Sequence, residues 1–160
     1  MQLTQLLDMA WEMQKELVES DDEMSPSHFY CESETGDILV IAVQYGSERE
    51  KTSLLNKLTA LFRQKGICRY VMVSEAWMVS REKKEEIESG PPPSECDDRV
   101  DTLVACACDR DTGEQISRQA KIERKDGARR VQEGEPLGKA EGRMLNLFRE
   151  QQRTEHTPVH

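Results

Sequence analysis

The chain has 160 residues, 33% of them charged and 36% hydrophobic, which is typical of one domain with a modest core that needs neither disulfides nor a metal. Its net charge of -9 divides into -12 over residues 1–117 and +3 over residues 118–160, so the acidic body disfavours nucleic acid and anionic membranes as partners. The longest apolar run, residues 38–43, is far shorter than the roughly 20 residues of a membrane span. The N-terminus also lacks a signal-peptide pattern, so we expect a cytoplasmic protein.

The first predicted element is an amphipathic helix over residues 3–17, because apolar residues recur there at steps of three and four. The acidic run that begins at Glu19 opposes the negative C-terminal end of the helix dipole, and the Ser-Pro pair at residues 25–26 resists helical continuation. The helix should therefore end near Glu19 and pack one face on a sheet. Its apolar residues are Leu3, Leu6, Leu7, Ala10, Met13 and Leu17.

A β-hairpin is predicted next, with strands at residues 28–31 and 38–43 and turn-forming residues at Gly36 and Asp37. The second strand, ILVIAV, is apolar at every position. A strand that is apolar on both faces is typical of the middle of a sheet. We therefore expect residues 38–43 to form a central strand.

A second helix should begin after Ser47, which forms a capping box with Glu50. An apolar stripe follows on one face, and Gly66 is suited to a left-handed C-terminal cap. This is the best-defined element of the sequence. The stripe consists of Leu54, Leu55, Leu58, Leu61 and Phe62.

Residues 68–79 predict a long strand with both faces largely buried. The triple proline that follows excludes a helix or a central strand, so residues 81–98 are expected to form a long loop. A second hairpin is predicted from residues 100–108 and 115–123, with Gly113 in its turn. The returning strand alternates apolar and polar residues, as expected for a strand with one wet face or at a sheet edge.

These elements predict an α+β fold with a mixed or mainly antiparallel sheet of about five strands and two principal helices packed mainly on one face. We expect a single domain over residues 1–126. Residues 127–142 hold four glycines and a proline, so residues 127–160 are expected to form a linker, a short helix and a flexible tail.

The segment YVMVSEAW at residues 70–77, followed by PSE at residues 93–95 and DRVD at residues 98–101, resembles a pattern found in uncharacterised bacterial and phage-borne proteins. The resemblance covers about residues 65–125. It implies a bacterial or phage origin and carries no activity, cofactor or catalytic residue to this chain.

Glu75 is the most informative single residue, because a carboxylate on an otherwise apolar strand face must be paired or become neutral. For a structural ion pair, the expected partner is Arg99 or Arg118. In a catalytic interpretation, Glu75 is the general acid or base of a small hydrolase or nuclease-like enzyme, with Asp97, Asp98 and Arg99 as further polar groups. We favour the ion pair, since buried pairs perturb carboxylates without any catalysis.

The five cysteines are an odd number, so they cannot form a complete set of intramolecular disulfides, and we expect thiols. His28 and Cys31 on one strand and Cys106 and Cys108 on another could supply four zinc ligands. Their spacing is not that of a structural zinc site, which normally uses C-x2-C pairs on tight turns, so we predict no metal and no cofactor. Cys96 lies among carboxylates, which makes it a poor nucleophile.

Arg124, Lys125, Arg129 and Arg130 form a basic segment that is the candidate partner-binding site. The segment lacks interleaved aromatic residues and lies beside acidic ones, so a solvated strand end is favoured over nucleic-acid binding. Docking onto an acidic surface, including that of another copy, is the alternative.

The common phosphate-binding, nucleophile and metal motifs do not occur in the sequence. We therefore favour a non-enzymatic accessory or protein-interaction domain. The expected partner is another protein or a second copy of the chain, joined in a homodimer through an uncovered strand edge or through the first helix. The alternatives are the hydrolase or nuclease-like enzyme built on Glu75 and a nucleic-acid-binding module at residues 124–130.

Overall fold

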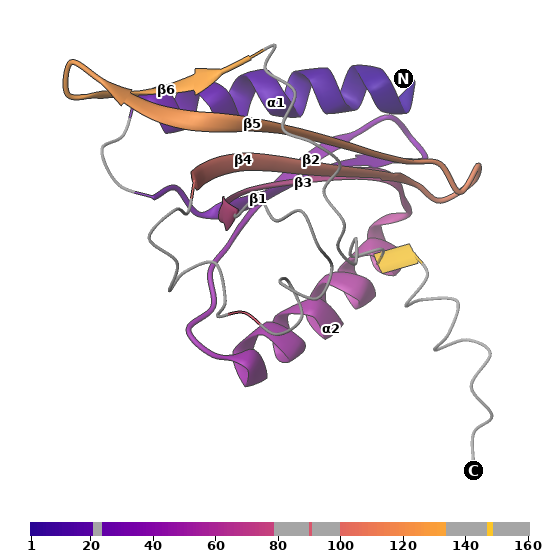
Figure 1. Cartoon of the computed structure of the whole chain (residues 1–160). Coiled ribbons are helices and arrows are strands. Elements are labelled where there is room, and N and C mark those ends of the chain that lie inside the picture. Colours follow the sequence, from indigo (N-terminus) through magenta and orange to yellow (C-terminus); the bar gives the residue numbers. More distant parts are fainter. Residues whose placement is uncertain (21–23, 79–89, 91–99, 134–146, 149–160) are drawn as a thin grey trace.

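A computed structural model of the chain describes residues 1–20, 24–78, 90, 100–133 and 147–148. Within these residues, two helices pack on a six-stranded antiparallel sheet, as Figure 1 shows. The predicted α+β fold class is confirmed. The elements in chain order are α1 (Leu3–Ser20), β1 (Ser27–Ser33), β2 (Ile38–Val43), α2 (Glu48–Lys65), β3 (Ile67–Met78), β4 (Val100–Asp109), β5 (Gln115–Lys125) and β6 (Ala128–Gln132).

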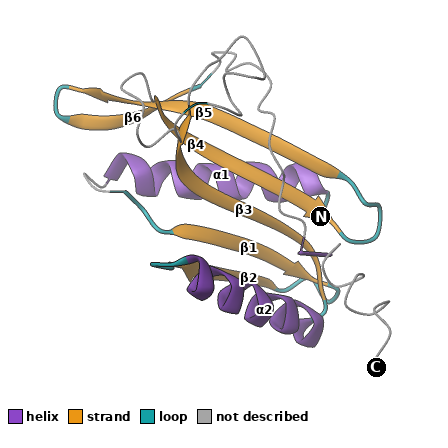
Figure 2. Cartoon of the chain, turned by 60° about the horizontal axis from the view of Figure 1, so that its bottom comes forward, coloured by secondary structure: helices purple, strands orange, loops and turns teal. Residues whose placement is uncertain are grey.

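The strands lie in the order β2-β1-β3-β4-β5-β6, and every neighbouring pair is antiparallel. The prediction that residues 38–43 form a central strand is wrong, because β2 is an edge strand (Figure 2). β1 pairs with β2 on one side and with β3 on the other. A central position in the sheet therefore does not explain why every residue of β2 is apolar.

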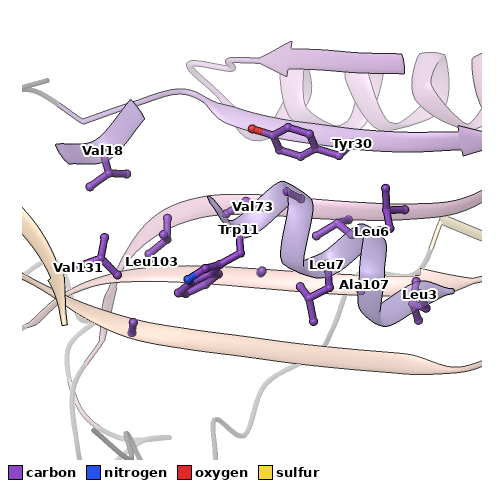
Figure 3. Close-up of a cluster of buried hydrophobic side chains, with 14 of the residues drawn as sticks. Leu3, Leu6, Leu7, Trp11, Val18, Tyr30, Val73, Leu103, Ala107 and Val131 are labelled. Atoms are coloured by element: carbon purple, nitrogen blue, oxygen red, sulfur yellow. The ribbon is translucent and has the colours of Figure 1, made fainter. Parts of the chain in front are cut away.

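α1 covers one face of the sheet, where it contacts β1, β3, β4 and β6. The first half of the predicted apolar stripe, from Leu3 to Ala10, is buried on this face, and Trp11 is completely buried there. The prediction is wrong for Met13 and Leu17, which are 45% and 42% exposed, because the second half of the helix buries Gln14 and Val18 instead. Figure 3 shows this cluster of side chains from the helix and the sheet. Its labelled members are Leu3, Leu6, Leu7, Trp11, Val18, Tyr30, Val73, Leu103, Ala107 and Val131.

α2 covers the opposite face, so the two helices do not share one side of the sheet as the sequence led us to expect (Figure 1). The reason is visible in β1, where Tyr30 joins the α1 cluster and Phe29 joins the α2 cluster, because successive strand residues point to opposite faces. Phe62 of α2 packs against Phe29 and Tyr70, with ring centroids 6.3 and 5.2 Å away. Phe148 completes this aromatic cluster, 5.2 Å from Tyr70.

Ser47 and Gly66 cap α2 as predicted, although the Glu50 side chain bonds to the residue before Ser47. The backbone amide of Glu50 donates to the Ser47 hydroxyl at 3.2 Å, and a Glu50 carboxylate oxygen accepts from the Gly46 amide at 2.6 Å. Gly66 ends the helix with a φ of 63°, a left-handed conformation that glycine adopts without strain.

β6 lies within residues that were expected to form a linker. Asp126 and Gly127 have φ values of 53° and 79°, and they connect Lys125 to Ala128, which face each other across the β5–β6 ladder. Two consecutive positive φ values are typical of a tight hairpin turn, and Asp-Gly is a strong sequence signal for it. That signal was present in the sequence, so β6 could have been predicted as a sixth strand.

Candidate functional site

Glu75 of β3 forms a buried ion pair with Arg129 of β6. Its Oε1 contacts Nη2 of Arg129, and the two side chains are 4% and 7% exposed. The other carboxylate oxygen, Oε2, accepts a hydrogen bond from the backbone amide of Ser25 at 2.5 Å. Both Glu75 oxygens therefore fasten the segment after α1 and the edge strand β6 to the centre of the sheet.

This arrangement bears on the candidate catalytic group. Asp97, Asp98 and Arg99 lie outside the described residues, so only Glu75 of that set has a described environment. Glu75 does not line either of two surface hollows described beside α1. Its partner Arg129 had been assigned to the basic segment, because the sequence gives no sign that β6 lies across the sheet from β3.

Arg118, another partner expected for Glu75, belongs to a different cluster on the same face. It contacts Asp8 at 3.4 Å and Glu133 at 3.0 Å, and its guanidinium carbon lies 4.4 Å from the ring centroid of Trp11. Glu133 also accepts from Nε1 of Trp11 at 2.6 Å and pairs with Lys15 at 3.4 Å. The Trp11 hydrogen bond and the two cations lower the pKa of Glu133 in spite of its partial burial, so its carboxylate fastens the end of β6 to α1.

A third ionic cluster joins β1, β3 and β4 and was not anticipated from the sequence. Arg69 donates to Glu32 at 2.5 Å and to Asp109 at 2.8 Å. Burial alone would raise the pKa of Asp109. The hydrogen bonds from the amides of Thr112 and Asp111, together with the Arg69 charge, lower this pKa by more than burial raises it, so it lies below its ordinary value. The three charged residues are neighbours only because the strand register brings them together, and their satisfied contacts indicate a structural role.

The structure divides the basic segment. Arg129 is buried in its pair with Glu75, whereas Arg124 and Lys125 are exposed where β5 ends. Arg130 is exposed and lies 3.7 Å from Glu19 of α1. The four residues therefore do not form one continuous basic surface.

The four described cysteines, Cys31, Cys68, Cys106 and Cys108, are buried and form no disulfide. Burial raises the pKa of Cys31 to about 12, so this thiol stays protonated near neutral pH. Within the residues that the structure describes, no group of three or more His, Cys, Asp or Glu side chains is placed to hold a metal ion. Cys96 lies outside those residues.

The outer edge of β2 presents a different kind of surface. Ile38 and Val40 are 40% and 44% exposed, and Ala42, two residues after Val40, is exposed as well. Val40 lies opposite Tyr30 in the ladder, so this exposed row is on the α1 face. α1 packs mainly on β1, β3, β4 and β6, and the three side chains of the row remain exposed.

The backbone of the same three residues points away from the sheet. The amide of Ser33 donates to the carbonyl of Asp37 at 2.9 Å where the β1–β2 hairpin closes. In an antiparallel pair, hydrogen-bonded positions alternate along the strand, so Leu39 and Ile41 bond to β1. The N–H and C=O groups of Ile38, Val40 and Ala42 therefore face outward, and no strand in the described part of the chain lies beyond them.

β2 lacks the features that normally protect an edge strand. Soluble proteins place lysine, proline or a bulge on such edges, whereas ILVIAV has no charge and no proline, and its pairing with β1 has no register shift. An edge of this composition is suited to pairing with another strand. We call the outward backbone and side chains of Ile38, Val40 and Ala42 the β2 edge.

No protein-family model, curated protein or solved structure matches this chain. Neither described helix combines the length and the apolar character that crossing a membrane requires.

Proposed function

We propose that the chain is a protein-interaction domain that binds an extended polypeptide segment by strand addition at the β2 edge. The observation that carries the proposal is the coincidence of outward backbone groups and exposed apolar side chains at Ile38, Val40 and Ala42. In strand addition, main-chain hydrogen bonds supply affinity and alternate side chains supply specificity. The β2 edge offers both.

The β2 edge is held in place from behind, which favours binding. Leu39 and Ile41 point to the other face, where they pack against the cluster that contains Leu58 and Phe62 of α2. Because the strand is already ordered, a partner does not have to supply the free energy of ordering it.

The turn that leads into β2 is also ordered by its own side chains. Thr35 donates to a carboxylate oxygen of Asp37 at 2.9 Å, and the Asp37 amide donates to the Ser33 hydroxyl at 3.1 Å. Gly36 supports the turn with a φ of 86°. These contacts fix the register of β2 at the end where the edge begins.

The chemistry of Glu75 supports an interaction domain over the enzymatic alternative. Both of its oxygens are engaged, one by Arg129 and the other by the Ser25 amide. A general acid or base must reach the proton that it transfers. Glu75 would have to break a buried ion pair before it could do so.

The test is a binding titration with soluble eight-residue peptides that alternate valine or isoleucine with threonine or lysine, followed by NMR of the labelled full-length chain. Wild type should bind, and the amides of residues 38–43 should shift. Val40→Pro removes an outward N–H at a position where an edge strand accepts proline, and it should weaken binding at least about tenfold.

The matched control is Val40→Thr, which keeps the outward N–H and a β-branched side chain. It should bind the peptides nearly as well as wild type. Equal binding by Val40→Pro, absence of binding by wild type at concentrations where the chain is monomeric, or shifts confined to another surface would contradict the proposal.

A further inference from the structure

We infer that the strand received by the β2 edge is β2 of a second copy, so that two chains pair antiparallel and join their six-stranded sheets into one. This inference rests on the proposed function of the β2 edge. It names the partner and predicts the register in which the two strands meet.

The register follows from the alternation of backbone directions. Outward-facing residues of one copy must lie opposite outward-facing residues of the other, because only these can exchange hydrogen bonds. Placing the two-fold axis at Val40 pairs Val40 with Val40 of the second copy and Ile38 with Ala42 of the second copy. This register uses every outward-facing residue of β2, whereas shifting the axis by one residue in either direction leaves one of them without a partner inside the strand.

The side chains fit the same register. On the α1 face, Ile38, Val40 and Ala42 from both copies form one apolar row, and each is exposed in the single chain. β2 carries no charged residue, so self-pairing brings no like charges opposite each other within the strand, an arrangement that would be destabilising.

Two-fold pairing also closes the assembly. Each copy uses its β2 edge once, and the surface is the same on both copies, as in isologous dimers. The other edge, β6, carries exposed Arg130 and does not repeat the apolar pattern. Association should therefore stop at two copies and not continue into a fibre.

Charge distinguishes a second copy from a basic partner. Each chain has a net charge of -9, so two copies repel at long range, and added salt screens this repulsion. Association of two copies should therefore strengthen as salt is raised. Binding of a basic polypeptide to the same acidic chain would weaken under the same change.

The experiment measures the mass of the full-length chain in solution by size-exclusion chromatography with light scattering over a range of concentrations and salt. Wild type should reach twice its chain mass of 18.4 kDa. Val40→Lys should halve that mass, while Val40→Thr should keep it. Leu17→Lys alters an exposed apolar residue of α1 and should also keep the dimer, whereas loss of the dimer in that variant would place the interface on the first helix.

Single cysteines then test the register, in a chain that carries Cys96→Ser. Val40→Cys should form an intermolecular disulfide on mild oxidation, because hydrogen-bonded pairs have Cα atoms about 5.5 Å apart, within the range of a disulfide. Ile38→Cys is the matched control, because Ile38 is similarly exposed. In this register Ile38 lies opposite Ala42 of the second copy, four residues along the strand from Ile38 of that copy. It should not cross-link alone, and it should do so when mixed with Ala42→Cys.

A monomeric mass at all concentrations and salt conditions would overturn the inference, and so would equal cross-linking of the Val40→Cys and Ile38→Cys chains. If the chain is monomeric but still binds strand peptides at the β2 edge, the second copy is wrong and the proposed function stands. If neither occurs, both fail.

Discussion

The two edges of the sheet, β2 and β6, differ in composition and in the contacts that attach them to the rest of the chain. β2 is entirely apolar, with one face packed against the cluster that contains α2 side chains and the other exposed. β6 has the sequence ARRVQ, and its Arg129 reaches back across the sheet to Glu75. β6 carries one arginine buried in an ion pair and another that is exposed, and charges of this kind oppose strand addition. β2 carries no charge, and its exposed apolar edge is accessible.

The largest expected effect comes from breaking the anchor of β6. Arg129→Ala leaves the Glu75 carboxylate buried without its counterion, which should lower the free energy of unfolding by about 3–5 kcal/mol. Urea unfolding followed by circular dichroism measures the change. Arg130→Ala, at an exposed neighbour whose contact with Glu19 is 3.7 Å, is the control and should change it by less than about 0.5 kcal/mol.

A double variant separates the charge effect from lost packing. Glu75→Gln keeps an oxygen for the Ser25 amide, so adding it to Arg129→Met should recover much of the lost stability, because no unpaired charge is then buried. A loss below about 1 kcal/mol for Arg129→Ala would mean that the ion pair does not anchor β6, and the contrast between the edges would fail.

A valine-to-threonine change compares the two edges directly. Val131 of β6 is 8% exposed and belongs to the α1 cluster, whereas Val40 of β2 is 44% exposed. Val131→Thr buries a hydroxyl and should cost about 1–3 kcal/mol of unfolding free energy. Val40→Thr should change it by less than about 0.5 kcal/mol in dilute solution. Equal losses at the two positions would show that the β2 edge is buried in the folded chain.

A smaller effect is expected from the carboxylate at the end of β6. The pKa of Glu133 is lowered in the folded chain, first by the hydrogen bond from Trp11. Its stabilising contribution is therefore present above the ordinary pKa of glutamate and is lost as the pH falls through the lower folded-state pKa. Glu133→Gln, which keeps the acceptor but not the charge, should be less stable than wild type near pH 7.

The difference between wild type and Glu133→Gln should shrink as the solution is acidified, because both side chains are then neutral. Thermal unfolding of the two chains across an acid pH series measures it. A difference that is constant with pH would contradict a role for the charge, and the end of β6 would then be held to α1 by packing alone.

Local features of the sequence predicted the two helices well. The Ser47 cap, the Gly66 cap and the apolar stripe between them defined α2 within a residue. The period of α1 identified the buried side of its first half, whereas Met13 and Leu17 of the predicted stripe are exposed. Caps and helical periods depend on residues a few positions apart, so they can be read without knowledge of the fold.

The features that determine the site depend on distant contacts. An apolar strand suits a central position or an exposed binding edge equally well, so composition alone placed β2 wrongly. Glu75 and Arg129 are far apart in sequence, and β4 and β5 lie between their strands in the sheet, so no local pattern predicts their contact. The Asp-Gly turn at residues 126–127 was a local signal, and recognising it would have supplied the missing strand.

The most direct test of the central claim is residue-specific amide hydrogen exchange in the full-length chain. In dilute solution, the amides of Ile38, Val40 and Ala42 should exchange fast, while those of Leu39 and Ile41 are protected by β1. At high concentration and raised salt, the three outward amides should become protected, and the other two should change little. Strong protection of the Val40 amide at every concentration would show that the edge is already covered within one chain and would contradict the account.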